Sequence, residues 1–159
     1  MALETRNYGF SLLELLVVSA VILSITGLAI SNYSSFSDTQ KIKQAGKTLK
    51  NDLRFIQTRA ASGVKPTTCV GANVLMSYRV TFTASSYTYQ PVCTSGLSGT
   101  AQTVTLPNRV SFSPIPSSID FQVLTGAAAS SVAFPMSFRL TGSNQSYSIL
   151  LSRNGDIND

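Results

Sequence analysis

The stretch that decides the fold of this chain lies at residues 9–30 and reads GFSLLELLVVSAVILSITGLAI. A helix rises about 1.5 Å per residue, so residues 10–30 would reach ~30 Å, the thickness of the hydrocarbon core of a bilayer. One carboxylate, Glu14, interrupts this apolar segment, and burying it there costs on the order of a few kcal/mol. Glu14 therefore predicts a function in which a partner cation comes within reach. The segment itself contains no lysine or arginine, so this cation would have to come from elsewhere.

These residues resemble the N-terminal signature of type IV prepilins and type II secretion pseudopilins: a short polar leader, a glycine before an aromatic residue, a glutamate at a fixed offset and a long apolar run. In that family a polytopic aspartic peptidase cuts after the glycine on the cytoplasmic face and methylates the new N-terminus. The resemblance implies that residues 1–9 are a cleaved leader, that the cut falls between Gly9 and Phe10, and that Phe10 is N-methylated. It also implies that Glu14 pairs with the N-terminal amine of a neighbouring subunit as a filament grows, since opposite charges attract strongly in a low dielectric.

Two other interpretations of the same segment are weaker. A plain, uncleaved signal anchor would make Glu14 an accident of sequence. A secretory signal peptide fits poorly, because the apolar run is too long and no Ala-x-Ala site follows it. One departure from the family pattern is Ser31, where many pilins carry proline, so we expect the helix to continue past Ile30 with Gly27 as its weak point.

A second helical pattern covers residues 38–63, where apolar residues recur at steps of three and four. Gly63 and Pro66 are expected to stop this helix. The two patterns predict one helix of about fifty residues, divided into a transmembrane and assembly part at 10–30 and an amphipathic part at 31–63. The predicted apolar stripe consists of Ile42, Ala45, Leu49, Leu53, Ile56 and Ala60.

Beyond the helix, at residues 64–159, the chain is rich in Ser, Thr, Val and aromatic residues and shows no helical periodicity. Alternating patterns predict a hairpin that turns at residues 84–86. Residues 142–144 and 154–155 are predicted turns, and 126–131 a loop of small residues. The predicted fold is α+β: a long N-terminal helix packed on a C-terminal domain of one or two antiparallel sheets, as in pilins. The strand candidates are residues 77–83, 87–90, 103–106, 109–113, 119–124, 132–140 and 146–152.

The β-rich part and the segment LKNDLRFIQ at residues 49–57 resemble the H-type pseudopilin and FimT-like minor pilin group. In that group, a helix ending in a similar Leu-x-x-Asp-Leu-Arg pattern precedes a β-rich domain. This match is looser than the one at the N-terminus. It implies that the chain is a minor pilin or pseudopilin.

The chain has two cysteines, Cys69 and Cys93, which flank the predicted hairpin. We expect a disulfide formed outside the cytoplasm, with two free buried thiols as the alternative. A metal site is not expected, because two cysteines in a chain without histidine cannot complete a tetrahedral zinc shell. The same lack of histidine excludes a Ser-His or Cys-His nucleophile, and no cofactor motif is present, so we expect a structural protein and not an enzyme.

Basic residues gather on the amphipathic helix, and the whole chain carries a net charge of +5. This face could attract DNA or anionic headgroups, although a solvated or inter-subunit face is the preferred interpretation. Some FimT-like pilins bind DNA through an arginine-bearing motif near the C-terminus, but here residues 152–159 read SRNGDIND, with one arginine and two acids. The candidate cations are Lys41, Lys43, Lys47, Lys50 and Arg54.

The flanking charges conflict with the topology that the resemblance implies. Arg6 precedes the apolar run, whereas several lysines follow it, so the positive-inside rule alone would keep the C-terminal domain in the cytoplasm. The prepilin signature instead fixes the leader inside. On this interpretation the chain is a single-pass subunit of the bacterial inner membrane with its head outside, and it later joins a pilus or secretion pseudopilus.

The partners that the resemblance implies are a prepilin peptidase, other pilin or pseudopilin subunits, an inner-membrane assembly platform and membrane lipid. Nucleic acid is an additional partner that is not favoured. Two alternative functions stay open: a pilus-associated module that binds DNA or a surface, as in natural transformation or adhesion, and a single-pass anchored domain that never polymerises.

Overall fold

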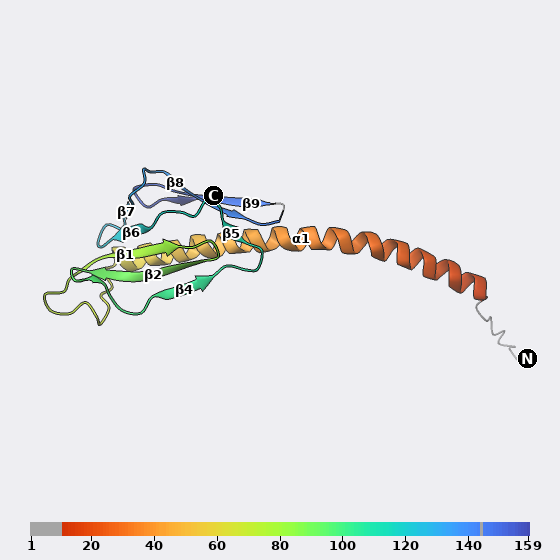
Figure 1. The fold of residues 1–159 in the computed structure, drawn as a ribbon, viewed down its shortest axis with the longest axis horizontal. Helices are drawn as coiled ribbons and strands as arrows, with labels where there is room; N and C mark the ends of the chain where they lie inside the picture. The colour runs from red at the N-terminus through yellow and green to blue at the C-terminus, as the bar shows by residue number, and fades with distance from the viewer. Residues whose placement is uncertain (1–10, 144) are drawn as a thin grey trace, which may run out of the picture. The chain divides into compact units, whose positions relative to one another are not determined.

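The computed structural model describes residues 11–143 and 145–159, and for residues 28–32 and 34 it describes the backbone alone. Within these residues the chain is an α+β fold with one helix, α1 (Leu12–Ala61), followed by strands that pair antiparallel (Figure 1). The predicted class is confirmed. The ten strands of the described residues are β1 (Leu75–Phe82), β2 (Ser86–Cys93), β3 (Gly96–Leu97), β4 (Gln102–Thr105), β5 (Ser111–Phe112), β6 (Ile119–Gln122), β7 (Ala128–Ala129), β8 (Met136–Thr141), β9 (Ser146–Leu151) and β10 (Ile157–Asn158).

The start of helix α1 is capped by Ser11, whose hydroxyl accepts a hydrogen bond of 3.2 Å from the backbone N–H of Glu14. Such a cap satisfies one of the unpaired N–H groups of the first turn, and an acidic residue in that turn interacts favourably with the helix dipole. The helix then runs without a break through Gly27 and Ser31. The expectation that it continues past Ile30 is confirmed.

The end of helix α1 follows from Gly63, which has a φ of +61°. The N–H of Val64 donates to the carbonyl of Arg59 at 3.1 Å, and the N–H of Gly63 donates to the carbonyl of Ala60 at 3.0 Å. This pair of bonds is a Schellman motif, which favours glycine at the left-handed position. Gly63 therefore terminates the helix as predicted, with the last helical residue at Ala61.

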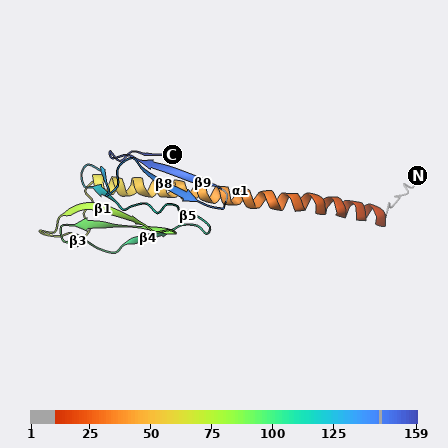
Figure 2. The ribbon, with the colours of Figure 1, turned by 45° about the horizontal axis from the view of Figure 1, so that its top comes forward.

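The predicted apolar stripe of α1 is buried: none of its six residues is more than 4 % exposed. These side chains belong to the same core as residues from both sheets. In Figures 1 and 2, this part of the helix runs between the green strands of the first sheet and the blue strands β8 and β9 of the second. Burial of the stripe on both sheets is the main apolar contact of the helix in this part of the chain.

The described strands form two antiparallel sheets. In the first, the order is β3-β2-β1-β6-β7, with β4 also paired to β2; in the second it is β10-β9-β8-β5. Strand β1 lies between β2 and β6, and its alternation places Tyr78 and Val80 in the core, with Arg79 and Thr81 more exposed. The two sheets meet at Phe82 of β1, whose ring lies 5.3 Å from the rings of both Phe112 and Phe138.

The predicted hairpin is present as β1 and β2, and longer strand candidates correspond to β4, β6, β8 and β9. Three strands of two residues each were not expected: β3, β7 and β10. Strand β7 lies inside residues 126–131, which were predicted to be a loop, because Ala128 pairs with Phe121 of β6. Periodicity cannot identify so short a strand, since two residues contain no repeat.

The predicted turn at residues 142–144 connects β8 to β9, and the N–H of Gly142 donates to the carbonyl of Gln145 at 2.9 Å. Asn144, its third predicted member, lies outside the described residues. The second predicted turn, at residues 154–155, precedes β10. Here the N–H of Gly155 donates to the carbonyl of Ser152 at 3.1 Å.

The chain divides into two compact units, one ending at Ser37 and the other comprising Asp38–Asp159. The second unit contains the C-terminal part of α1 as well as all the described strands, because the stripe from Ile42 onward packs in the core of the sheets. The boundary between the two compact units therefore lies within the helix. Within the described part of the chain, no helix combines the length and the apolar character that crossing a membrane requires.

Candidate functional site

The N-terminal candidate site is described from Ser11 onward. Gly9 and Phe10, the predicted cleavage and methylation residues, lie outside the described residues together with the rest of the predicted leader. Glu14 lies in the first turn of α1, surrounded by exposed apolar side chains such as Leu12 (85 % exposed) and Leu16 (61 %). None of the ion pairs formed among the described residues includes Glu14. Among the described residues, Glu14 therefore has no cationic partner.

The hydroxyl groups in the apolar part of α1 are satisfied within the helix. Ser19, Ser24 and Thr26 donate to backbone carbonyls three or four residues earlier, at 2.9, 2.8 and 2.7 Å. Such bonds remove the need for water or for an outside partner. Apart from Glu14, the described side chains of residues 12–27 can therefore be buried in an apolar environment without leaving a side-chain donor unpaired.

The basic residues of the predicted anion face do not act as one group. Lys41 lies 3.5 Å from Asp38, Lys50 forms an ion pair with Asp159, and Arg54 donates to the carbonyl of Ile157 at 3.2 Å. The remaining two, Lys43 and Lys47, are exposed, and no ion pair among the described residues involves them. Three of the five candidate cations thus already contact groups of this chain.

Lys50, Arg54 and Gln57 lie on successive turns of α1 and hold the C-terminal segment against the helix. The side-chain amide of Gln57 donates to the carbonyls of Gly155 (3.0 Å) and Gly126 (3.2 Å). Sequence reasoning assigned Lys50 and Arg54 to an anion face and missed these contacts, which join positions about one hundred residues apart. No local pattern could have indicated them.

Asp159 receives two side-chain contacts at this place. Lys50 and Tyr147 both donate to its carboxylate, the latter at 2.7 Å. The hydrogen bond from Lys50, followed by that from Tyr147, lowers the pKa of Asp159 to about 2. The same hydrogen bond to Asp159 raises the pKa of the Tyr147 phenol.

The two cysteines form a disulfide, with Cα atoms 5.8 Å apart. Cys69 lies in the loop after α1, and Cys93 ends β2, where its strand partner is Leu75. The disulfide is therefore not a rung between paired strands. It ties the loop after the helix to the base of the first hairpin, and both cysteines are buried.

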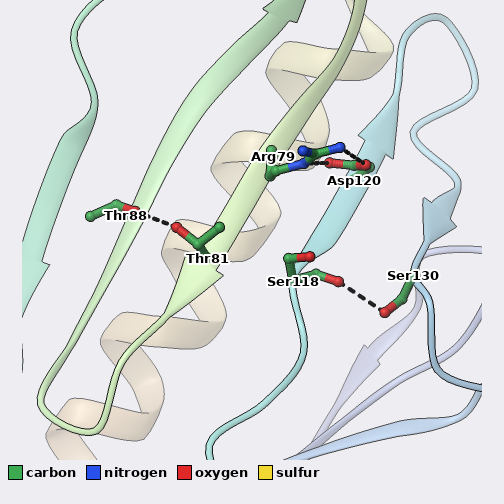
Figure 3. A network of polar contacts seen from close by, with 6 residues as sticks. All are labelled: Arg79, Thr81, Thr88, Ser118, Asp120 and Ser130. Atoms are coloured by element: carbon green, nitrogen blue, oxygen red, sulfur yellow. Dashed lines mark hydrogen bonds and ion pairs between the residues drawn. The ribbon is translucent and has the colours of Figure 1, made fainter. Parts of the chain in front are cut away.

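An ion pair on the first sheet was also missed by sequence reasoning. Arg79 of β1 and Asp120 of β6 are direct register partners, and the guanidinium donates to both carboxylate oxygens at 2.7 and 2.8 Å (Figure 3). This hydrogen-bonded geometry raises the pKa of Arg79. Thr81 and Thr88 form a second cross-strand contact at 2.5 Å, so these side chains support the pairing of β1 with both neighbours.

No cluster of three His, Cys, Asp or Glu residues that could hold a metal occurs in the described part of the chain. Comparisons with family models, curated proteins and solved structures found no match to this chain.

Proposed function

We propose that this chain is a structural subunit, a minor pilin or pseudopilin, of a type IV pilus or type II secretion filament. Its N-terminal helix enters the filament, and its β-rich part faces outward. The observation that carries this proposal is the position of Glu14: one carboxylate in the first turn of a helix that is otherwise apolar and exposed over its first turns. A charge kept there at a cost is best explained by a partner cation that arrives on assembly.

The proposed assembly step uses the new N-terminus of the mature chain. Cleavage after Gly9 frees the amine of Phe10, and the methylation that follows keeps this amine a cation, one helical turn from Glu14 along the sequence. In a filament, Glu14 of one subunit pairs with this amine of its neighbour. Because an unpaired charge is penalised in an apolar environment, only the axial register that makes the pair is favoured.

The proposed location before assembly is the inner membrane, with residues 10–30 as the anchor and the head outside. The satisfied hydroxyls of Ser19, Ser24 and Thr26 support burial of this segment in lipid or among other subunits. The disulfide between Cys69 and Cys93 supports a head that folds in an oxidising compartment. The proposed partners are prepilin peptidase, membrane lipid, the assembly platform and neighbouring subunits.

Co-expression with a prepilin peptidase tests the class of protein. We expect the purified chain to begin at N-methylated Phe10, as measured by intact mass and N-terminal sequencing. An inactive peptidase is the control and should leave the chain beginning before residue 9. An uncleaved chain in the presence of active peptidase would contradict the proposal and leave an ordinary anchored domain.

The role of Glu14 is tested by Glu14→Gln, which keeps the shape of the side chain and removes its charge. We expect this variant to be cleaved and held in the membrane but lost from sheared filaments. Glu4→Gln is the matched control, because Glu4 leaves with the leader and its loss of charge should not affect incorporation. Normal incorporation of Glu14→Gln would contradict the role proposed for Glu14. Absence of the parent chain itself from sheared filaments would support the alternative of an anchored domain that does not polymerise.

The alternative of a DNA receptor has less support in the described residues. Lys41, Lys50 and Arg54 contact other groups of this chain, so Lys43 and Lys47 are the two residues of the predicted anion face that are left for a phosphate chain. Binding that depends on phosphate contacts falls steeply with salt. We would measure the electrophoretic mobility of duplex DNA with the protein at low salt. A mobility shift that the double variant Lys43→Gln, Lys47→Gln abolishes would favour this alternative.

A further inference from the structure

A pocket of about 450 Å³ lies where the end of α1 meets the first sheet. Its lining comes from the last turns of the helix, the loop before Cys69, strands β1 and β2, and the segment that leads into β4. This volume falls within the range of small-molecule sites, ~300–1,000 Å³. The lining combines aromatic and proline rings with hydroxyl and amide groups around one cation, Arg59. The residues that line the pocket lie between Phe55 and Gln102 and do not include Glu14.

The guanidinium of Arg59 is held by aromatic rings. Its central carbon lies 5.5 Å from the ring centre of Phe55, one turn earlier on α1, and 5.6 Å from that of Tyr78 on β1. Tyr78 is itself fixed, because it is buried and its hydroxyl donates to the carbonyl of Val64 at 2.6 Å. Contact with ring faces leaves the N–H groups at the edge of a guanidinium available for hydrogen bonds. Arg59 is thereby positioned before any ligand arrives.

Arg59 has no acidic partner in this part of the structure. No ion pair among the described residues includes it, and none of the described residues that line the pocket is acidic. A half-buried arginine in such a pocket favours an anionic group, and a carboxylate is a group that it can bind in a bidentate way.

The walls of the pocket are tied together. The disulfide fixes Cys69 to β2, next to Thr68, and the N–H of Ser98 donates to the carbonyl of Pro91 at 3.0 Å. Gly99, with a φ of +79°, lies so close to Thr68 that a Cβ there would contact the threonine side chain. Fixed walls reduce the ordering cost of binding. The pocket is therefore largely formed without a ligand.

From these features we infer that the pocket binds an acidic saccharide, a sugar whose ring carries a carboxylate. Arg59 binds the carboxylate, and the Tyr89 and Pro91 rings offer flat apolar faces to the C–H side of the sugar ring. The hydroxyls of Thr68 and Thr100 and the amide of Gln102 are suited to the sugar hydroxyls. A nucleic acid strand fits less well, because proteins that bind single strands follow the backbone with a groove of several cations. Here the lining holds one.

Calorimetric titration of the full-length chain in detergent micelles tests this inference, with digalacturonate and neutral digalactose as probes. We expect saturable binding of digalacturonate and about tenfold weaker binding of digalactose, since one charge-assisted contact is lost. Equal binding of the two sugars, or no saturable binding of either, would overturn the inference. Tetrathymidylate is the third probe, and its binding in place of digalacturonate would assign the pocket to nucleic acid and overturn the inference as well.

Variants of the pocket separate its cation from its general shape. Arg59→Gln is expected to weaken digalacturonate about tenfold and leave digalactose unchanged, so that the preference for the acid disappears. Arg153→Gln, an equal loss of charge outside the pocket lining, is the control and should keep the preference. If Arg59→Gln does not fold, Gln102→Glu provides a second test on an exposed strand residue. Its carboxylate should compete for Arg59 and weaken the acidic sugar alone; an unchanged preference in either folded variant would contradict the assignment.

Discussion

The hydroxyl of Tyr87 on β2 donates a hydrogen bond to the carboxylate of Asp52 on α1, which joins the first sheet to the helix beside the buried stripe. Tyr87 is 1 % exposed, so its phenol is satisfied inside the protein and not by water. Burial, followed by the hydrogen bond to Asp52, raises the pKa of Tyr87 far above its ordinary value of 10. Asp52 is thus used inside the fold, although the sequence presents it simply as an acid on a basic helix.

Replacing Tyr87 by Phe tests this contact. The change leaves a carboxylate without its donor, and we expect the free energy of unfolding to fall by about 1–3 kcal/mol, measured by denaturant titration at neutral pH. Tyr33→Phe is the control, because Tyr33 is 75 % exposed and its change should be nearly neutral. Equal stability of Tyr87→Phe and the parent would show that the hydrogen bond contributes nothing net.

The same residue predicts a loss of stability at alkaline pH. Because the folded-state pKa of Tyr87 is raised, its contribution is fully present below the unfolded-state value of about 10 and declines as pH rises above it. We expect the denaturation midpoint of the parent to fall above about pH 10 more steeply than that of Tyr87→Phe. Parallel curves for the two proteins would contradict this account.

Asp159 predicts the opposite dependence at acid pH. Its pKa is lowered to about 2, so its contacts with Lys50 and Tyr147 act above the ordinary value of 3.8 and are lost as pH falls toward 2. We expect the hydrogen-exchange protection of β9 and β10 to decrease from about pH 5 to about pH 2. In Asp159→Asn this decrease should be smaller. Protection that is identical in the two proteins at every pH would rule out a role for the carboxylate.

Gly46 is required by the close approach of Tyr147. A Cβ at Gly46 would overlap the Tyr147 ring, although alanine favours a helix by about 1 kcal/mol over glycine. We therefore expect Gly46→Ala to destabilise the parent by about 1–3 kcal/mol. In a Tyr147→Ala background the same change should stabilise. Gly27→Ala, on the same helix with no atom near the new Cβ, is the control and should not destabilise either protein.

We expect removal of the disulfide to lower the free energy of unfolding. Cys69 and Cys93 are 24 residues apart. A loop of that length corresponds to about 3.5 kcal/mol of stabilisation in the chain-entropy model. We expect the double variant Cys69→Ser, Cys93→Ser to lose about that much, as measured by denaturant unfolding. The control is reductant. It should lower the free energy of unfolding of the parent by a similar amount and leave that of the variant unchanged, which would assign the effect to the disulfide. A variant as stable as the oxidised parent would contradict it.

Much of the helix could be predicted because its signals are local. The stripe from Ile42 to Ala60 repeats every three or four residues, and the stop at Gly63 depends on neighbours within one turn. The β1–β2 hairpin was found for the same reason, since its strands are joined by a short turn. The short strands β3, β7 and β10 could not be found, because their existence depends on a longer strand that happens to lie beside them.

The candidate sites divide in the same way. Glu14 could be selected as a candidate from the sequence, because it is the one charged residue in an apolar segment and this feature does not depend on the tertiary structure. The assignment of Lys50 and Arg54 to an exposed anion face did not foresee their contacts with the C-terminal segment. The pocket around Arg59 is lined by separate segments between Phe55 and Gln102. No periodic pattern in the sequence predicts that these segments lie together.

The sequence by itself determined the long helix, its buried stripe, its glycine stop and the isolated Glu14, since each follows from the chemistry of residues within a few turns of one another. Only the tertiary structure decided how the strands divide into two sheets, that Asp52 meets Tyr87, that Lys50 meets Asp159, and that Arg59 lies in a pocket without an acid. Asp52 and Tyr87 are 35 positions apart in the sequence, and Lys50 and Asp159 are 109 positions apart. Their partners are selected by the path of the whole chain around its core, which no local pattern encodes.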